Sequence, residues 1–352
     1  MAAGNRKSPT RAKSSESQYS ITEFTDRFPN DDACLGYLWR TRYAPDGEHA
    51  PCPSAKCGGA EQTFRKYDGK QQRQAWTCVA CGQYLYPTAG TIFHKSSTSL
   101  HLWFYAMYIM ASTRCGVSAK QLERELGVTY KTAWRMFNKI RNQLMVEDRE
   151  MPMNGKVEMD EMFVGGKPRQ SDKAEWARKA EAAGTQGARY SEAQKWSDAN
   201  KTPVFGIVQR NAETVTADGE IVPDRGTSKV VAYVVPSVQA KTVNAHMVRH
   251  VATSSVVYTD DAPIYRRLGK DGWEHHTIKH SEAVYVNGDV HTQAIEGFWS
   301  LVKRSLSGTH HSVSAKWLQG YLNEYVWRYN RRDNPRAMFE LLLLLSAQPV
   351  AE

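Results

Sequence analysis

Two cysteine pairs constrain the fold of this chain more than any other feature of its sequence. Four residues separate Cys52 from Cys57, two separate Cys78 from Cys81, and a glycine directly follows each pair. Four thiolates on two tight turns form a tetrahedral cage for Zn²⁺, and the glycines let the backbone turn around the sulfurs. Redox-active or buried free cysteines are the alternative, but they leave the paired spacing and the glycines unexplained. We therefore expect one structural zinc ion, because four cysteines leave no open position for a substrate.

The composition describes a globular protein that favours a polyanionic partner. Of 352 residues, 41% are hydrophobic and 24% are charged, which suits a main domain with one or two small modules. The formal charge of +9 favours nucleic acid through counterion release, although basic proteins with other partners are common. The sequence has no run of 18 apolar residues and no apolar signal-peptide core. We therefore expect a cytoplasmic protein with no membrane partner.

Two further apolar features are expected to belong to the hydrophobic core. Cys34 and Cys115 lie in apolar helical patterns, where a free cysteine behaves as a small hydrophobic residue. The run Leu341–Leu345 is too short to cross a bilayer and follows a helical pattern. It is expected to be the buried side of a terminal helix.

Residues 118–140 have the pattern of two short helices joined by a tight turn. Ser118 and Thr129 are expected N-caps, and Gly127 is expected to end the first helix. An ordinary helical hairpin is the alternative, but the Gly-Val-Thr turn and the basic outer face favour a helix-turn-helix that reads DNA. The residues expected to reach the major groove from the start of the second helix are Tyr130, Lys131, Thr132 and Arg135.

Two strand-like segments carry carboxylates at positions that could meet. Residues 157–164 alternate as a strand that contains Asp160, and the buried strand 256–259 ends at Asp260 and Asp261. Adjacent strands can bring Asp160 and Asp260 together, although spacing alone does not prove it. A turn cap or a surface residue is the usual role of a single Asp after a strand.

A later amphipathic helix carries a third carboxylate. From about Thr292 to Ser305, apolar residues form one stripe, while Glu296 and Lys303 share another face. A solvated face is the ordinary reading, but seven residues are too many for an ion pair between Glu296 and Lys303. Three carboxylates from separate segments suit two hard divalent cations and phosphodiester chemistry.

Five segments together resemble a known family. They are Asp160–Lys167 (DEMFVGGK), Tyr258–Asp260 (YTD), His291–Arg304 (HTQAIEGFWSLVKR), Gly308–Ser314 (GTHHSVS) and Tyr329–Arg331 (YNR). The chain resembles the zinc-ribbon group of bacterial insertion-sequence transposases, called ISXO-like, over most of its length.

The resemblance implies a ribonuclease-H-like catalytic fold that holds two Mg²⁺ (or Mn²⁺) ions. Its DDE triad falls on Asp160, Asp260 and Glu296, and Lys303 is the basic residue seven positions later. Relatives often have Asn where Gln293 stands, so Gln293 is an alternative to Glu296 as the third site residue. Asp261 is an alternative to Asp260 as the second. The resemblance also implies double-stranded DNA as the partner, both transposon ends and target, contacted by Lys303 and Arg304. A homodimer or larger assembly is expected when two ends are held together, in a bacterial protein associated with the nucleoid.

The expected organisation is a multidomain α+β protein, and its helical module lies between a zinc ribbon and a mixed α/β catalytic domain. The expected boundaries are a disordered basic tail at 1–18, an N-terminal helix and four-cysteine zinc ribbon at 19–95, a helix-turn-helix module at 96–150, a ribonuclease-H-like domain at 155–335 with an inserted segment at about 168–202, and a C-terminal helix and tail at 336–352.

Two other classes of function remain open from the sequence. A sequence-specific DNA-binding regulator, or an inactivated transposase relic, would need the cysteine unit and the helix-turn-helix but not the three acids. A ribonuclease-H-like nuclease or resolvase would cut DNA without joining it. Asp160→Asn separates the regulator from the enzymes, because it should leave DNA binding intact and abolish catalysis.

Overall fold

The computed structural model describes residues 19–68, 74–113, 115–146, 152–165, 201–215, 221–224, 228–278, 290–333 and 335–350. The expected basic tail and most of the expected inserted segment lie outside these residues. The chain divides into two compact units, Met1–Met145 with Asn334–Glu352, and Val146–Asp333.

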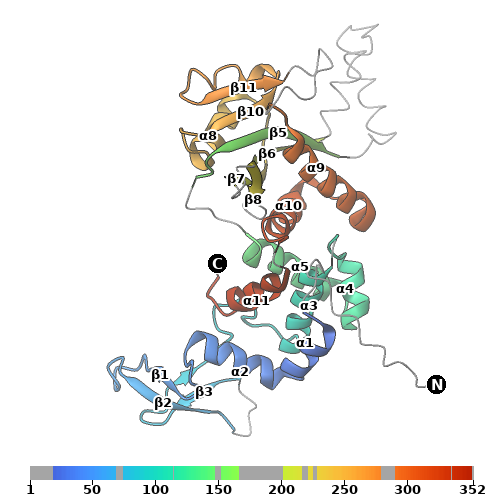
Figure 1. The fold of residues 1–352 in the computed structure, drawn as a ribbon. Coiled ribbons are helices and arrows are strands. Elements are labelled where there is room, and N and C mark those ends of the chain that lie inside the picture. The colour runs from blue at the N-terminus through green and yellow to red at the C-terminus, as the bar shows by residue number, and fades with distance from the viewer. Residues whose placement is uncertain are drawn as a thin grey trace, which may run out of the picture. The chain divides into compact units, whose positions relative to one another are not determined.

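The first unit combines helices with a small antiparallel sheet (Figure 1). Its helices are α1 (Ile21–Arg27), α2 (Asp31–Arg42), α3 (Leu100–Ser112), α4 (Ala119–Leu126), α5 (Tyr130–Lys139), the π-helical turn η1 (Ile140–Leu144) and α11 (Pro335–Ser346). Its sheet has the order β1 (His49–Pro51), β2 (Glu61–Lys66), β3 (Trp76–Cys78) and β4 (Tyr84–Leu85).

Helix α2 packs on this sheet through aromatic rings. Trp39 of α2 stacks on Trp76 of β3, with ring centroids 4.6 Å apart and an interplanar angle of 4°. Trp39 also contacts Phe64 of β2, with centroids 5.6 Å apart. A sheet of two to six residues per strand has few other apolar side chains to bury, so these rings supply much of its core.

Helices α4 and α5 have the caps expected from the sequence. The side chains of Ser118 and Thr129 each accept a hydrogen bond from a backbone N–H in the first turn of the helix that follows. Gly127 ends α4 in the left-handed conformation, with φ of 62°. Leu122 and Phe137 are fully buried, so the inner faces of both helices belong to the core.

The terminal helix α11 joins the core of the first unit, as its leucine run predicted. Leu342 and Leu343 are fully buried, and Phe339 lies against Phe24 with ring centroids 6.0 Å apart. None of the helices in the described residues has the length and apolar character needed to cross a membrane.

The expectation for Cys34 and Cys115 was right for one of them. Cys34 in α2 is fully buried, as a core residue should be. Cys115 is exposed, so its assignment to the core was wrong. The reason is that α3 ends at Ser112, and Gly116 with φ of 79° turns the chain where the apolar pattern suggested more helix.

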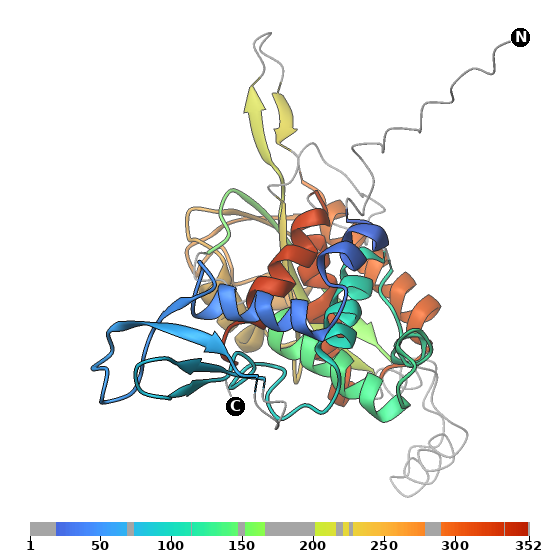
Figure 2. The ribbon, with the colours of Figure 1, turned by 90° about the horizontal axis from the view of Figure 1, so that it is seen from below.

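The second unit is a five-stranded mixed sheet flanked by helices (Figure 1). Its strands are β5 (Lys156–Val164), β6 (Thr202–Gln209), β9 (Lys229–Val234), β10 (Val256–Asp260) and β11 (Glu274–Ile278), in the spatial order β11-β10-β5-β6-β9. Its helical segments are α8 (Ala240–His250), η2 (Pro263–Tyr265), α9 (Gln293–Ser305), η4 (Leu306–His310) and α10 (Ala315–Tyr329). Strands β5, β6 and β9 pair antiparallel, whereas β5, β10 and β11 pair parallel. Between β6 and β9, the hairpin β7 (Ala212–Val215) and β8 (Ile221–Asp224) extends away from the sheet (Figure 2).

The two faces of β5 have different partners, because successive side chains of a strand point to opposite faces. Val157 and Met159 are buried in an apolar cluster with Val243 and Met247 of α8. Glu158 and Asp160 lie on the opposite face. That face receives helix α9, since Glu158 accepts hydrogen bonds from the first turn of this helix. Glu158 and Asp160 are thus separated from the apolar core by the sheet itself.

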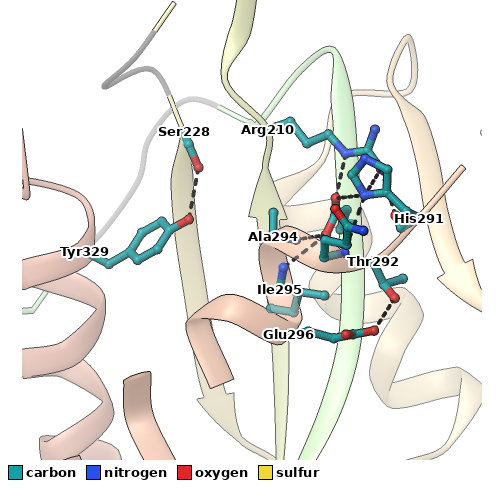
Figure 3. Close-up of polar contacts among 10 residues, drawn as sticks. Arg210, Ser228, His291, Thr292, Ala294, Ile295, Glu296 and Tyr329 are labelled. Atoms are coloured by element: carbon teal, nitrogen blue, oxygen red, sulfur yellow. Dashed lines mark hydrogen bonds and ion pairs between the residues drawn. The ribbon is translucent and has the colours of Figure 1, made fainter. Parts of the chain in front are cut away.

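The outer edge of β9 is closed by two side chains of α10 and its C-cap. Asn330 accepts a hydrogen bond from the Val230 N–H at 2.7 Å and donates one to the Val230 carbonyl at 3.0 Å. Gln319 accepts from the Val234 N–H at 2.8 Å. Beside them, the Tyr329 and Ser228 hydroxyls are 3.3 Å apart (Figure 3). These contacts satisfy backbone groups that an edge strand would otherwise expose, and they give the Tyr329–Arg331 segment a structural role.

Candidate metal centres and nucleic-acid surfaces

The four paired cysteines converge on one point of the first unit. The sulfurs of Cys52, Cys57, Cys78 and Cys81 all lie within 4.8 Å of one another. Each pair sits on a tight turn, and the glycine after each pair has positive φ, 60° at Gly58 and 75° at Gly82. Four thiolates at this separation suit tetrahedral Zn²⁺.

The environment of the four thiols is uneven. Burial, together with the neighbouring thiols, raises the pKa of Cys57 to about 12. The backbone N–H of Gln83 lowers the pKa of Cys81 to about 6. Cys81 therefore becomes a thiolate, the form that ligates a metal, more readily than Cys52 or Cys57.

In the second unit, the sheet aligns the first two carboxylates expected from the sequence. Strands β5 and β10 are parallel, with Glu158 opposite Tyr258. Asp160 and Asp260 each stand two residues further along, so they occupy equivalent points on adjacent strands and share the α9 face. Asp261 follows the end of β10 and is exposed.

The third carboxylate, Glu296, lies in the first turns of α9 and affects Asp160 electrostatically. Burial, together with the nearby carboxylates of Asp260 and Glu296, raises the pKa of Asp160 to about 6. The backbone N–H of Glu161 and the indole N–H of Trp299 oppose this shift only in part. The structure therefore brings Asp160, Asp260 and Glu296 close enough for their charges to interact.

The carboxylates are more loosely gathered than the sulfurs. Among the residues that the structure describes, only the four cysteines form a group whose ligand atoms all lie within 4.8 Å of one another. The hydroxyl of Thr292 donates to Glu296 Oε1 at 2.7 Å and holds this carboxylate at the start of α9 (Figure 3). Gln293, the alternative third residue, is exposed in the same turn.

A glycine lets α9 lie against the sheet beside Asp160. Gly206 of β6 pairs directly with Asp160 of β5. A Cβ atom at Gly206 would lie 2.5 Å from Trp299 Cζ2 and 3.1 Å from Ile295 Cδ1. Only glycine admits the Trp299 ring at this point. Sequence reasoning missed this role, although a single glycine inside a strand often marks a close approach of another element.

A second carboxylate on the same face of β5 is fully occupied by hydrogen bonds. Glu158 is 0% exposed, and its Oε1 accepts from Arg210 Nε at 2.6 Å. Its Oε2 accepts from the backbone N–H groups of Ala294 and Ile295 at 2.8 and 3.0 Å. His291 Nδ1 lies 3.2 Å from Oε1. No role was assigned to Glu158 from the sequence. The feature that could have pointed to one is an acidic residue at a position of the strand that faces inward.

The opposite face of the sheet holds a further acid. The buried Tyr265 hydroxyl donates a short hydrogen bond to Glu161, and burial raises the pKa of Glu161 to about 7. Asp160 and Glu161 therefore differ in their partners, since Glu161 has a phenol on the α8 face and Asp160 has other acids on the α9 face.

The residues expected to contact DNA are mostly on the surface. Lys303 and Arg304 are exposed near the end of α9, and Arg304 Nε donates to the Ser300 carbonyl at 3.3 Å. At the start of α5, Tyr130 and Lys131 are exposed.

Three of the expected α5 contacts have partners within the first unit. Arg135 donates to the Thr98 hydroxyl at 3.0 Å. The Thr132 N–H and hydroxyl both contact the Thr129 hydroxyl, at 3.3 and 3.1 Å. Tyr130 stacks on Trp134 with ring centroids 6.3 Å apart, and Lys120 Nζ lies 5.4 Å from the Tyr130 ring centroid.

Two comparisons with known proteins agree with this arrangement. Residues 152–330, which contain the three carboxylates and α9, match the model of the ISXO2-like transposase domain. A protein in the transposable element ISH50 of Halobacterium salinarum is 30% identical over 281 residues, which cover 79% of this chain and 84% of the relative.

Proposed function

The chain belongs to the ISXO2-like transposase family, and we propose that it is a DDE-type transposase that binds insertion-sequence terminal repeats and catalyses metal-dependent strand cleavage and strand transfer. One observation carries the proposal. Asp160 and Asp260 occupy equivalent points on adjacent parallel strands, and the charges of Asp260 and Glu296 both act on Asp160. A ribonuclease-H-like assignment is supported by the five-stranded mixed sheet with α9 laid across it.

The donor set fits hard divalent cations. Asp160, Asp260 and Glu296 offer carboxylate oxygens, the ligands that Mg²⁺ and Mn²⁺ prefer. Burial and the neighbouring carboxylates raise the pKa of Asp160, and bound cations would favour its ionised form. Two such ions would activate water or a DNA 3′-hydroxyl and stabilise the leaving oxygen of a phosphodiester.

For the second and third site residues, we prefer Asp260 and Glu296 to the alternatives Asp261 and Gln293. Asp260 is favoured over Asp261, because Asp260 is the last residue of β10 whereas Asp261 lies beyond the strand and is exposed. Glu296 is favoured over Gln293, because its charge raises the pKa of Asp160. Lys303, two helical turns after Glu296 on α9, would contact a DNA phosphate, with Arg304 beside it.

The first unit would bind DNA. We assign the four cysteines to a structural zinc ribbon and α4–α5 to a helix-turn-helix, whose contacts to DNA would be Tyr130, Lys131, Thr132 and Arg135. Both ends of the element must be held together for strand transfer, so a dimer or larger assembly on DNA follows from the reaction.

The test uses duplexes that carry the inverted repeats flanking the gene. Protein is incubated with these duplexes and a supercoiled target, in Mg²⁺ or in EDTA, beside Asp160→Asn. Cutting at the repeat 3′ ends and joining to the target, both lost in EDTA and in the variant, is the expected result. Tight binding to the repeats without chemistry in either protein would instead identify a regulator or an inactive relic. Cutting without joining would identify a nuclease.

A further inference from the structure

The Glu158–Arg210 pair is a buried ion pair with an unusual set of neighbours. Glu158 is 0% exposed and the Arg210 side chain is 11% exposed. Burying two charges is unfavourable unless good geometry and further hydrogen bonds compensate for lost solvation. Here both oxygens of Glu158 already accept hydrogen bonds, so this carboxylate is not available to a metal ion.

Glu158 also replaces the missing cap of α9. The N-cap residue Thr292 makes no side-chain capping bond, because its hydroxyl is directed to Glu296. Glu158 instead reaches from β5 and accepts from the N–H groups of Ala294 and Ile295 (Figure 3). An anion at a helix N-terminus is favourable because it meets unpaired N–H groups and the positive end of the helix dipole. The start of α9 is therefore fixed to β5.

Arg210 extends these contacts to a third segment. Its guanidinium lies 4.4 Å from the ring centroid of Tyr258 in β10. Its Nη2 donates to the His291 carbonyl at 2.7 Å, just before α9 (Figure 3). One ion pair thus touches β5, β10 and the beginning of α9.

Each of the three segments that the ion pair touches carries one of the three carboxylates two residues after the contact. Asp160 follows Glu158 by two residues, and Asp260 follows Tyr258 by two. Glu296 follows Ala294 by two as well. In a strand this spacing keeps both side chains on one face, and in α9 it limits how far Glu296 can move from the anchored turn.

From these contacts we propose that Glu158 and Arg210 are positioning residues that align Asp160, Asp260 and Glu296 for divalent-cation binding. The inference rests on the proposed function of the three carboxylates. Glu158 acts through α9 and touches neither the cation nor DNA. An ion pair that only stabilises the fold is the alternative, and the chain offers a matched control for it.

The control is the pair Glu324–Arg328 within α10. Its side chains are 0% and 11% exposed, as in Glu158–Arg210, and Glu324 Oε1 accepts from Arg328 Nε at 2.9 Å. It belongs to the same unit. Glu324→Gln therefore reports what losing a buried carboxylate does to stability alone.

The experiment measures Mn²⁺ binding to the full-length protein by electron paramagnetic resonance, with thermal unfolding of each variant alongside. Glu158→Gln is expected to weaken Mn²⁺ binding about 10- to 100-fold, the range for residues that orient metal ligands. Glu324→Gln is expected to lower the melting temperature without weakening Mn²⁺ binding. The double variant Glu158→Gln with Glu296→Gln should lose less Mn²⁺ affinity than the sum of the two single losses, because both changes act in part on the same ligand.

Other outcomes overturn the inference. Unchanged Mn²⁺ binding in Glu158→Gln, equal weakening in Glu158→Gln and Glu324→Gln, or additive losses in the double variant would each leave Glu158 with a purely structural role. If Glu158→Gln does not fold, Arg210→Lys keeps a positive charge beside Glu158 but removes the contact to the His291 carbonyl, and it should still weaken Mn²⁺ binding. Wild-type protein that binds Mn²⁺ but does not cut DNA would contradict the proposed function alone, whereas wild-type protein that binds no Mn²⁺ would contradict both.

Discussion

The four-cysteine cluster of the first unit and the carboxylate group of the second are both candidate metal centres, but they are assembled differently. The sulfurs lie within 4.8 Å of one another, on turns close together in the chain. The carboxylates come from two strands and a helix far apart in sequence, and their mutual repulsion contributes to the raised pKa of Asp160. The first site is shaped by local backbone turns, and the second by the packing of a whole sheet and helix.

This difference predicts opposite dependence on metal. The β1–β4 sheet has short strands and a small aromatic core, so an ion that joins its two cysteine turns should contribute much of its stability. The carboxylates lie on a sheet whose other face has its own apolar core and whose helix is anchored by Glu158. The second unit should therefore fold without its ions.

The largest expected effect is loss of the small sheet when zinc is removed. Structural zinc sites contribute on the order of 10 kcal/mol to folding, so a zinc-selective chelator, or Cys81→Ser, should unfold β1–β4. The stacked Trp39–Trp76 pair lies in this region, and its near-UV circular dichroism and fluorescence would report the change. The exposed Cys115 provides the control, since Cys115→Ser should keep full zinc content. An unchanged tryptophan signal in metal-free protein would contradict the comparison.

Asp160→Asn is expected to differ from zinc removal, because it should lose most of its activity and keep its fold. Removing a metal-binding carboxylate should reduce strand cleavage at least roughly 100-fold, the upper range already seen for residues that only orient ligands. The variant should bind terminal-repeat DNA as tightly as the wild type in the absence of metal. Cleavage and joining assays with matched binding curves measure both. Wild-type cleavage rates in this variant would remove Asp160 from the site.

The sequence was most informative where a structure depends on neighbouring residues. The cysteine spacing predicted the sulfur cluster, and Ser118, Gly127 and Thr129 predicted the limits of α4 and α5. Alternation in the strand around Asp160 predicted β5. These signals are local, because a cap or turn involves residues within a few positions of one another.

The sequence was least informative where a residue acts on a distant segment. Glu158 caps a helix more than a hundred residues later in the chain, and Gly206 makes room for Trp299. Asn330 pairs with the edge of a strand a hundred residues earlier. A carboxylate in a strand, a glycine or an asparagine does not reveal its partner until the tertiary fold brings the two together.

The stability of the metal-free protein should depend on pH through Asp160. Its folded pKa of about 6 lies above its ordinary value of 3.8, so folding favours the protonated form. The folded state should therefore lose stability as pH rises from about 4 to about 6, by on the order of 2–3 kcal/mol at about 1.4 kcal/mol per pKa unit. Glu161, with a pKa raised to about 7, should extend the loss to neutral pH.

Thermal unfolding across this pH range, for wild type and Asp160→Asn, measures the contribution of Asp160. The variant should gain stability over the wild type as pH rises from 4 to 6, and the difference should then stay constant. Saturating Mn²⁺ should reduce the difference at neutral pH, because the ion stabilises the ionised carboxylate of the wild type. If the difference in stability between the two proteins were the same at every pH, the ionisation of Asp160 would not be the cause of the pH dependence.

The smallest expected effect tests how closely α9 must lie on the sheet. Gly206→Ala places a methyl group 2.5 Å from the Trp299 ring, so the helix must shift, at about 1–3 kcal/mol for overpacking. Because Trp299 and Glu296 are on the same helix, the shift should also weaken Mn²⁺ binding. Gly297→Ala is the matched control on α9, since nothing lies within 4 Å of its added methyl. It should be neutral or stabilise the protein by up to about 1 kcal/mol through helix propensity. Denaturant unfolding and Mn²⁺ titration of both variants measure the difference. Equal Mn²⁺ binding in Gly206→Ala and Gly297→Ala would mean that the three carboxylates still bind the ion when α9 moves. The close packing of α9 on the sheet would then not determine the metal site.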